Sequence, residues 1–205
     1  MRTHPPTLEQ TVAPEARPCT VEELLQNLKQ DDRSDDTLAE CLRHLDAAIA
    51  ECQRITYRQL ITATYEFQLR GFEAIEIPLP RPPLQGVTTI HYLDTGNAWQ
   101  LLSTSVYEVD TKGTPGVVRL KYGQTWPSTL GHARDVKIKF TAGYGDEPED
   151  VPAALRQAIL ALASYFYENP LTTSSEPEGP PLAPWATQQV FRAYRAHGCL
   201  PIWEH

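Results

Sequence analysis

Two stretches of this sequence decide the fold: IPLPRPPLQGVTTIHY at residues 77–92 and VKIKFTAGYGDEPEDVPAALRQAILALASYFYENP at residues 136–170. The first is a proline-stiffened segment that runs into a predicted strand. The second predicts a strand, a glycine turn and a helix that is apolar nearly all round. Neither stretch contains a nucleophile beside a base, a cluster of metal ligands or a phosphate-binding loop, which favours a scaffold over an enzyme.

Composition restricts the class of protein. The chain has 205 residues, of which 41% are hydrophobic and 21% charged, so it can bury a core. Its net charge of −8 argues against a protein whose whole surface binds nucleic acid. The four cysteines have no short paired spacing, and no segment resembles a signal peptide or a membrane span. We therefore expect a reduced, soluble, intracellular protein.

The periodicity of apolar residues predicts an α+β fold. A small helical core would hold two N-terminal helices (20–30 and 36–54) and one long apolar helix (151–168). Between them, a period of two over residues 55–141 predicts an inserted antiparallel sandwich or barrel-like module of about six strands. The termini are expected to be extended, with an arm at residues 1–18 and a tether at 170–184. Residues 19–169 would then be the main domain.

Two helices suggest contacts with other chains. The helix over residues 151–168 is apolar on more than one side, so we expect a neighbouring copy to cover part of it. That interface would involve Leu160, Ala161, Ser164 and Tyr165. The short helical pattern after residue 184 places Val190, Phe191 and Tyr194 on one face, the form of a docking element on a tether.

Several groups of residues suggest chemistry but have simpler interpretations. Four carboxylates that resemble a metal site lie at a helix N-terminus, where the dipole favours them: Asp146, Glu147, Glu149 and Asp150. The Gly143–Gly145 turn is followed by acidic residues that would repel a phosphate. Cys41, His44 and Cys52 could hold zinc, but both cysteines belong to an apolar helix stripe. We therefore expect no metal, no cofactor and no catalytic residues.

Two further features concern macromolecular ligands. The PRPP run at residues 80–83 could be a peptide ligand, but beside a strand it fits a bridge between sheets or a sheet edge. Arg119 and Lys121 share one predicted strand face, and Lys137 and Lys139 share another. These four cations are candidates for contact with DNA phosphates, although solvated outer faces of a sandwich look the same.

Several short motifs follow one another along the chain: ECQRIT at 51–56, LPRPPLQ at 79–85, Val-x-x-Ile-x-Tyr-x-Asp at 87–94, Trp-Pro at 126–127, FTAGYG at 140–145, VP-x4-QAIL at 151–160 and YEN at 167–169. In this order they resemble the motifs of the head–tail connector (adaptor) proteins of long-tailed double-stranded DNA bacteriophages. The match runs from about Thr20 to Asn169. The FRAYR run at 191–195 is similar to the end of that family.

The resemblance implies a non-enzymatic neck protein of the virion, made in the host cytoplasm. Copies would form a ring, expected to be a dodecamer, beneath the portal protein, and the ring would receive a stopper or tail-completion protein. DNA would pass through the channel without sequence-specific contacts, and no membrane is involved. On this basis Trp185, Val190, Phe191, Tyr194 and Arg195 are expected to dock on the portal.

Two other classes compete with this interpretation. A monomeric β-sandwich that binds a sugar or a peptide would need exposed aromatic residues in a groove and no self-association. A phage hydrolase would need a catalytic constellation that the sequence does not contain.

Overall fold

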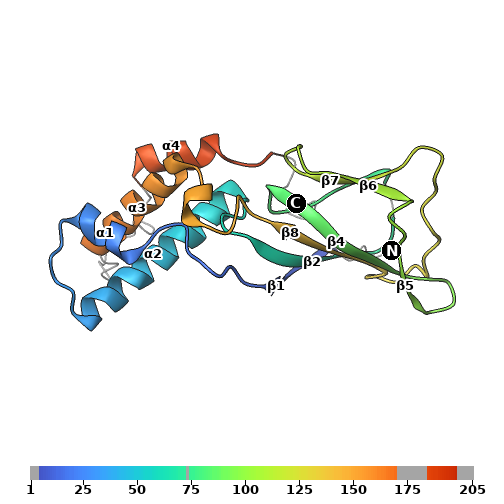
Figure 1. Cartoon of the computed structure of the whole chain (residues 1–205), viewed down its shortest axis with the longest axis horizontal. Helices are drawn as coiled ribbons and strands as arrows, with labels where there is room; N and C mark the ends of the chain where they lie inside the picture. The colour runs from blue at the N-terminus through green and yellow to red at the C-terminus, as the bar shows by residue number, and fades with distance from the viewer. Residues whose placement is uncertain (1–4, 73, 170–183, 198–205) are drawn as a thin grey trace, which may run out of the picture. The chain divides into compact units, whose positions relative to one another are not determined.

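The computed structural model describes residues 5–72, 74–169 and 184–197, which form two compact units (Figure 1). The described part of the helical unit lies within residues 16–56 and 147–195. The described part of the β unit comprises residues 5–15, 57–72, 74–146 and 196–197. The predicted α+β class is thereby confirmed. Within the described residues, no helix combines the length and the apolarity that crossing a bilayer requires.

The first helix, α1 (Val21–Leu28), begins where the sequence predicts. The Glu23 N–H donates to the Thr20 hydroxyl at 3.2 Å, and the Thr20 N–H donates to the Glu23 carboxylate at 2.8 Å. This reciprocal capping box satisfies two N–H groups that a helix start otherwise leaves without a partner. The helix ends at Lys29, whose φ of 54° is left-handed.

The described part of the helical unit holds three more α-helices: α2 (Asp35–Thr56), α3 (Ala153–Glu168) and α4 (Trp185–Ala193). The predicted stripe of α2 is confirmed, because Cys41, Leu45, Ala48 and Cys52 are all buried. A 3-10 turn, η1 (Pro148–Asp150), precedes α3. The apolar helix predicted over residues 151–168 corresponds to α3, which has 16 residues, whereas α2 has 22.

Arg156 on α3 joins the segment before α1 to the rest of the helical unit. Its Nε donates to the Pro18 carbonyl at 2.9 Å, and its guanidinium also pairs with Glu23, the residue of the capping box. A planar guanidinium can make both contacts at once, which a lysine ammonium cannot do in the same geometry. The start of α1 is therefore fixed by α3 as well as by its own cap.

The larger sheet of the β unit is antiparallel throughout, in the order β1-β2-β8-β4-β5. Its strands are β1 (Thr7–Val12), β2 (Ala63–Leu69), β8 (Val136–Ala142), β4 (Leu84–Leu93) and β5 (Trp99–Leu101). β2 and β8 alternate buried and partly exposed residues, as the period of two predicts. The smaller antiparallel sheet has the order β3-β7-β6, with β3 (Glu76–Pro78), β7 (Val117–Leu120) and β6 (Tyr107–Asp110).

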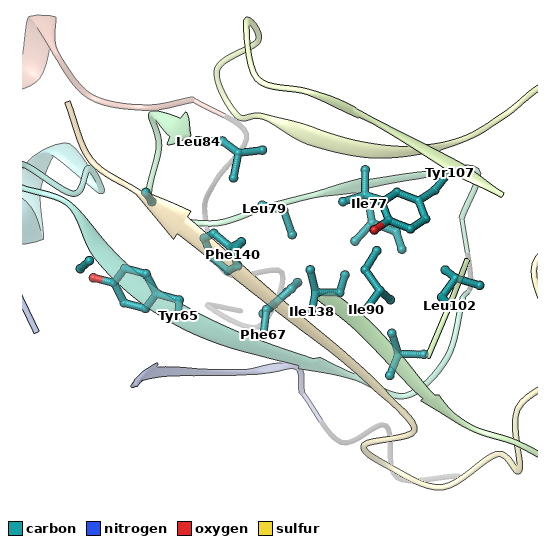
Figure 2. Packing of buried hydrophobic residues seen from close by; sticks show 14 residues of the cluster. Tyr65, Phe67, Ile77, Leu79, Leu84, Ile90, Leu102, Tyr107, Ile138 and Phe140 are labelled. Atoms are coloured by element: carbon teal, nitrogen blue, oxygen red, sulfur yellow. The ribbon is translucent and has the colours of Figure 1, made fainter. Parts of the chain in front are cut away.

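The two sheets share one hydrophobic core (Figure 2). Phe67, Ile90 and Ile138 of the larger sheet belong to the same buried cluster as Ile77 and Tyr107 of the smaller one. Both sheets have free edges, and no closed barrel forms among the described strands. The barrel-like form is therefore wrong, and the described residues of the predicted module form seven strands, β2 to β8, rather than about six.

The predicted extended arm is extended but is not separate from the fold. Residues Thr7–Val12 form β1, an edge strand that pairs with β2 from Thr7 opposite Gln68 to Val12 opposite Thr64, with a shift of register between Gln10 and Val12. The sequence pattern does not predict this pairing, because β1 is polar and four of its six residues are exposed. The predicted tether at residues 170–184 lies, apart from Pro184, outside the described residues.

Candidate functional site: interaction surfaces

The residues considered as metal ligands do not gather into a site. The Glu147 N–H donates to the Asp150 carboxylate at 3.1 Å, so Asp150 serves the start of η1. His44 lies edge-on to the ring of Tyr167, with centroids 6.0 Å apart. Within residues 5–72, 74–169 and 184–197, no three His, Cys, Asp or Glu side chains are placed to hold a metal ion.

The Gly143–Gly145 turn uses its own backbone N–H groups. The Gly143 N–H donates to the Pro83 carbonyl at 2.9 Å, and the Tyr144 N–H donates to the Leu60 carbonyl at 2.9 Å. A phosphate cradle needs N–H groups that are free to bind the anion. The turn joins β8 to the segments before β2 and β4 and has a structural role.

The buried thiols are poor nucleophiles. Burial, with a smaller contribution from the nearby Glu23 carboxylate, raises the pKa of Cys19 to about 11. Burial also raises the pKa of Cys52 to about 12. Since the thiolate is the reactive form, neither group reacts readily near neutral pH.

The face of α3 that its own chain leaves open is small and carries a charge only at its C-terminal end, on Glu168. Leu160 is only 5% exposed, so the chain itself covers it and a neighbour is not required. Ser164 accepts a hydrogen bond from the Asn27 amide at 3.0 Å, and both Ser164 and Tyr165 are partly buried. Ala161 is exposed. Of the four residues predicted for a subunit interface, Ala161, Ser164 and Tyr165 retain surface for one.

The sequence predicts that the last helix docks on a partner at the end of a tether, apart from the core. In the structure, α4 is instead part of the helical core. It packs against α2 and α3, and Phe191 is fully buried. The correction has a simple cause, because an amphipathic helix has the same sequence pattern whether it docks on its own chain or on a partner. Trp185 at its start is 75% exposed, Arg195 is exposed, and Val190 and Tyr194 are partly buried.

The four cations proposed for DNA contact lie on different surfaces of the β unit. Arg119 pairs with Glu76 at 2.6 Å and Glu108 at 3.6 Å, so its charge is balanced within the smaller sheet. The Lys121 ammonium donates to the Thr104 carbonyl at 2.8 Å. Lys137 and Lys139 lie on the outer face of the larger sheet, and Lys137 is 4.7 Å from the centre of the Trp99 ring.

Sequence reasoning did not single out β5 as a surface. Trp99 and Leu101 are 46% and 63% exposed at the edge of the larger sheet. Their alternation with Gln100 was visible, but alternation alone does not say which of the two faces is covered.

Comparison of the sequence with protein-family models and with curated proteins finds no match. Comparison of the fold with solved structures does. A chain in the neck of an empty gene transfer agent (GTA) particle, computed with C6 symmetry, has a TM-score of 0.75 and 22% identity, over 93% of this chain and 95% of that one.

Two further structures agree. A chain in the neck of a native GTA particle, computed with C12 symmetry, has a TM-score of 0.72 and 22% identity, over 93% of this chain and 95% of that one. A chain in the virion of a native GTA particle has the same TM-score and identity, over 92% and 95%. The likeness therefore extends over nearly the whole of both chains, and this protein has the fold of a chain seen in GTA necks.

Proposed function

We propose that this protein is a structural component of the neck of a tailed phage or phage-like particle. The observation that carries the proposal is a fold shared over more than nine-tenths of both chains with proteins of GTA necks. The connector-like order of motifs supports the same role from the sequence. The role is non-enzymatic and requires no cofactor.

In this role identical copies form a ring between the portal protein and a stopper or tail-completion protein, and DNA passes through the ring. The C6 and C12 symmetries of the neck structures support a ring, with twelve copies as the expected number. The ring forms in the host cytoplasm and functions in the virion.

We assign the contact between copies to the exposed face of α3. Ala154, Gln157, Ala161 and the partly buried Tyr165 carry no charge, and the exposed carboxylate of this helix, Glu168, lies at its C-terminal end. The exposed face of α2, by contrast, carries Glu40, Arg43 and Asp46, as a solvated helix face does. The uncharged part of the α3 face costs little to desolvate when another protein covers it.

The test measures assembly of the full chain with its portal protein by mass photometry and electron microscopy. The wild-type protein should form rings on the portal, and Ala161→Glu should prevent ring formation because it buries a carboxylate in the interface. Ala47→Glu, at an exposed alanine of α2, is the matched control and should assemble normally.

Two results would count against these assignments, and they differ. If the wild-type chain stays monomeric and does not bind the portal, the neck role is wrong. If rings form equally well with Ala161→Glu, the neck role stands and the α3 interface is wrong.

A further inference from the structure

Strand β5 is an unprotected edge of the larger sheet. Natural sheets protect their edges against pairing with other chains by means of charged residues and prolines. The other three edge strands among the described residues follow this rule: β1 carries Glu9, β3 carries Glu76 and Pro78, and β6 carries Glu108 and Asp110. β5 is Trp99-Gln100-Leu101 and has neither charge nor proline.

The backbone of β5 has hydrogen-bonding groups directed away from β4. The Leu102 N–H donates to the Ile90 carbonyl at 2.8 Å, and the Asp94 N–H donates to the Ala98 carbonyl at 3.0 Å. Bonded and non-bonded pairs alternate along an antiparallel ladder. With Gln100 opposite Tyr92, the N–H and C=O of Trp99 and Leu101 therefore point to the free edge.

The side chains beside this edge are apolar and cationic. Lys137 lies over the Trp99 ring on the outer face of the sheet. His91 of β4 is opposite Lys137 on one side and Leu101 on the other, so these three residues form a row across the sheet. Arg134 is exposed in the loop before β8, and this loop is tied to the end of β4 because the Leu93 N–H donates to the Asp135 carbonyl.

The nearby carboxylates are already engaged. Asp94 accepts hydrogen bonds from the N–H groups of Gly96 and Ala98 and from the Gln100 amide. Glu66, two strands away from β4, accepts a hydrogen bond from the Gln68 amide and is 3.9 Å from Lys137. The free edge is thus bordered by two cations, Arg134 and Lys137, of which Lys137 also pairs with Glu66, and by the apolar side chains of Trp99 and Leu101.

We propose that β5 is a strand-addition site, which binds an extended acidic segment of a partner protein. The segment would pair with the outward N–H and C=O groups of Trp99 and Leu101. On the outer face its apolar side chains would cover the Trp99 and Leu101 side chains, and its carboxylates would lie near Lys137 and Arg134. Main-chain pairing supplies affinity in this mode of recognition, and the flanking side chains supply the preference. This site is independent of the ring assigned to α3.

The test uses the full-length protein and a fluorescent synthetic peptide of Val-Thr-Glu-Thr repeats, which places Val and Glu on the same face of the added strand. A peptide of Val-Thr-Lys-Thr repeats, with the same spacing and the opposite charge, is its control. The acidic peptide should bind about ten-fold more tightly than the basic one, a difference of about 1.4 kcal/mol. Lys137→Gln should reduce this preference.

Two variants of Leu101 separate strand pairing from simple adhesion. Leu101→Pro removes an N–H that points to the free edge and breaks no bond to β4, so it should fold and weaken acidic-peptide binding about ten-fold. Leu101→Val keeps the N–H and the apolar side chain and should bind like the wild type.

A second measurement does not depend on the variants. Binding of the acidic peptide should slow hydrogen exchange of the Trp99 and Leu101 amides about ten-fold or more, because those amides become hydrogen-bonded. Unchanged exchange, or equal binding of the two peptides, overturns the proposal. So does a DNA duplex that displaces the peptide and binds Leu101→Pro as well as wild type, since the surface would then be a nucleic-acid site.

Discussion

Gly143, in the turn that follows β8, has no room for a side chain. Its φ is +138°, and a Cβ there would lie 2.6 Å from the Thr62 nitrogen and 2.8 Å from the Ile61 carbonyl carbon. We expect Gly143→Ala to lower the free energy of unfolding by about 2–4 kcal/mol, because it adds backbone strain and a clash with backbone atoms. Urea unfolding measures the loss.

Gly123 provides the matched control for this prediction. Its φ is also positive, at +74°, but a Cβ there meets no atom within 4 Å. Gly123→Ala should therefore cost only the backbone term, about 1 kcal/mol. If the two variants lose equal stability, the close approach of the turn to residues 61 and 62 is not what requires glycine at residue 143.

The buried Cys52 thiol makes stability depend on alkaline pH. Its pKa is about 12 in the folded chain, against an ordinary value of 9.0. Below pH 9 the thiol is protonated in both states and its contribution is fully present. Above pH 9 the unfolded chain releases the proton and the folded chain does not, so stability falls by up to about 1.4 kcal/mol per pH unit.

Cys52→Ala should remove that share of the slope between pH 9 and 11, whatever it does to stability at pH 7. The measurement is the free energy of unfolding by urea at several pH values. A slope that is the same in both proteins would show that Cys52 ionises as easily in the folded chain as in the unfolded one.

At the scale of residues, contacts between neighbours in the chain can be predicted from the sequence, and contacts between residues far apart in the chain cannot. The capping box of Thr20 and Glu23 depends on a spacing of three residues, so the sequence alone predicts it. The guanidinium of Arg156, which reaches that same Glu23 and the Pro18 carbonyl, is more than 130 residues away in the chain. No pattern of neighbouring residues predicts such a contact.

Among the helices, α4 carries one aromatic residue that is buried in the fold and another that is exposed to solvent. Phe191 is fully buried, whereas Trp185, two turns earlier, is 75% exposed. Phe191→Ala should lower the free energy of unfolding by about 3–5 kcal/mol, because it leaves a cavity in the helical unit. Trp185→Ala should change stability by less than about 0.5 kcal/mol. Thermal and urea unfolding distinguish the two.

Portal binding, unlike stability, should depend on the exposed Trp185. If α4 docks on the portal, as the sequence analysis proposes, Trp185→Ala should weaken binding about ten-fold or more, since exposed tryptophans are frequent anchors at interfaces. A matched variant, Gln189→Ala, changes another exposed position of α4 and should bind normally. Undiminished portal binding by Trp185→Ala would remove α4 from the interface.

The elements themselves were largely predictable, and their partners were not. β2 and β8 follow the period of two that the sequence shows over residues 55–141, so strands are predictable there. The sequence predicts an extended arm where β1 lies, because polar side chains do not show that the backbone pairs with another strand. The fold of α4 onto α2 and α3 was missed because its apolar face fits a partner equally well.

For the whole molecule, charge is distributed unevenly between the two units. The described residues of the helical unit hold thirteen Asp and Glu but eight Lys and Arg, while those of the β unit hold nine of each. Affinity for DNA comes mainly from cations that displace counterions from phosphates. An acidic helical unit and a balanced β unit offer little of this, which suits the proposed ring, through which DNA would slide.

We therefore expect no binding of a labelled DNA duplex to the free protein at physiological salt, measured by fluorescence anisotropy. At low salt, where screening is weaker, any residual binding should come from Lys137 and Lys139, whose strand face is exposed or partly exposed. The double change of both lysines to Gln should abolish it, and Arg119→Gln should not, because Arg119 is paired with Glu76 and Glu108. Tight binding at physiological salt would contradict this account, because a polyanion held by the protein would be retained in the channel rather than released through it.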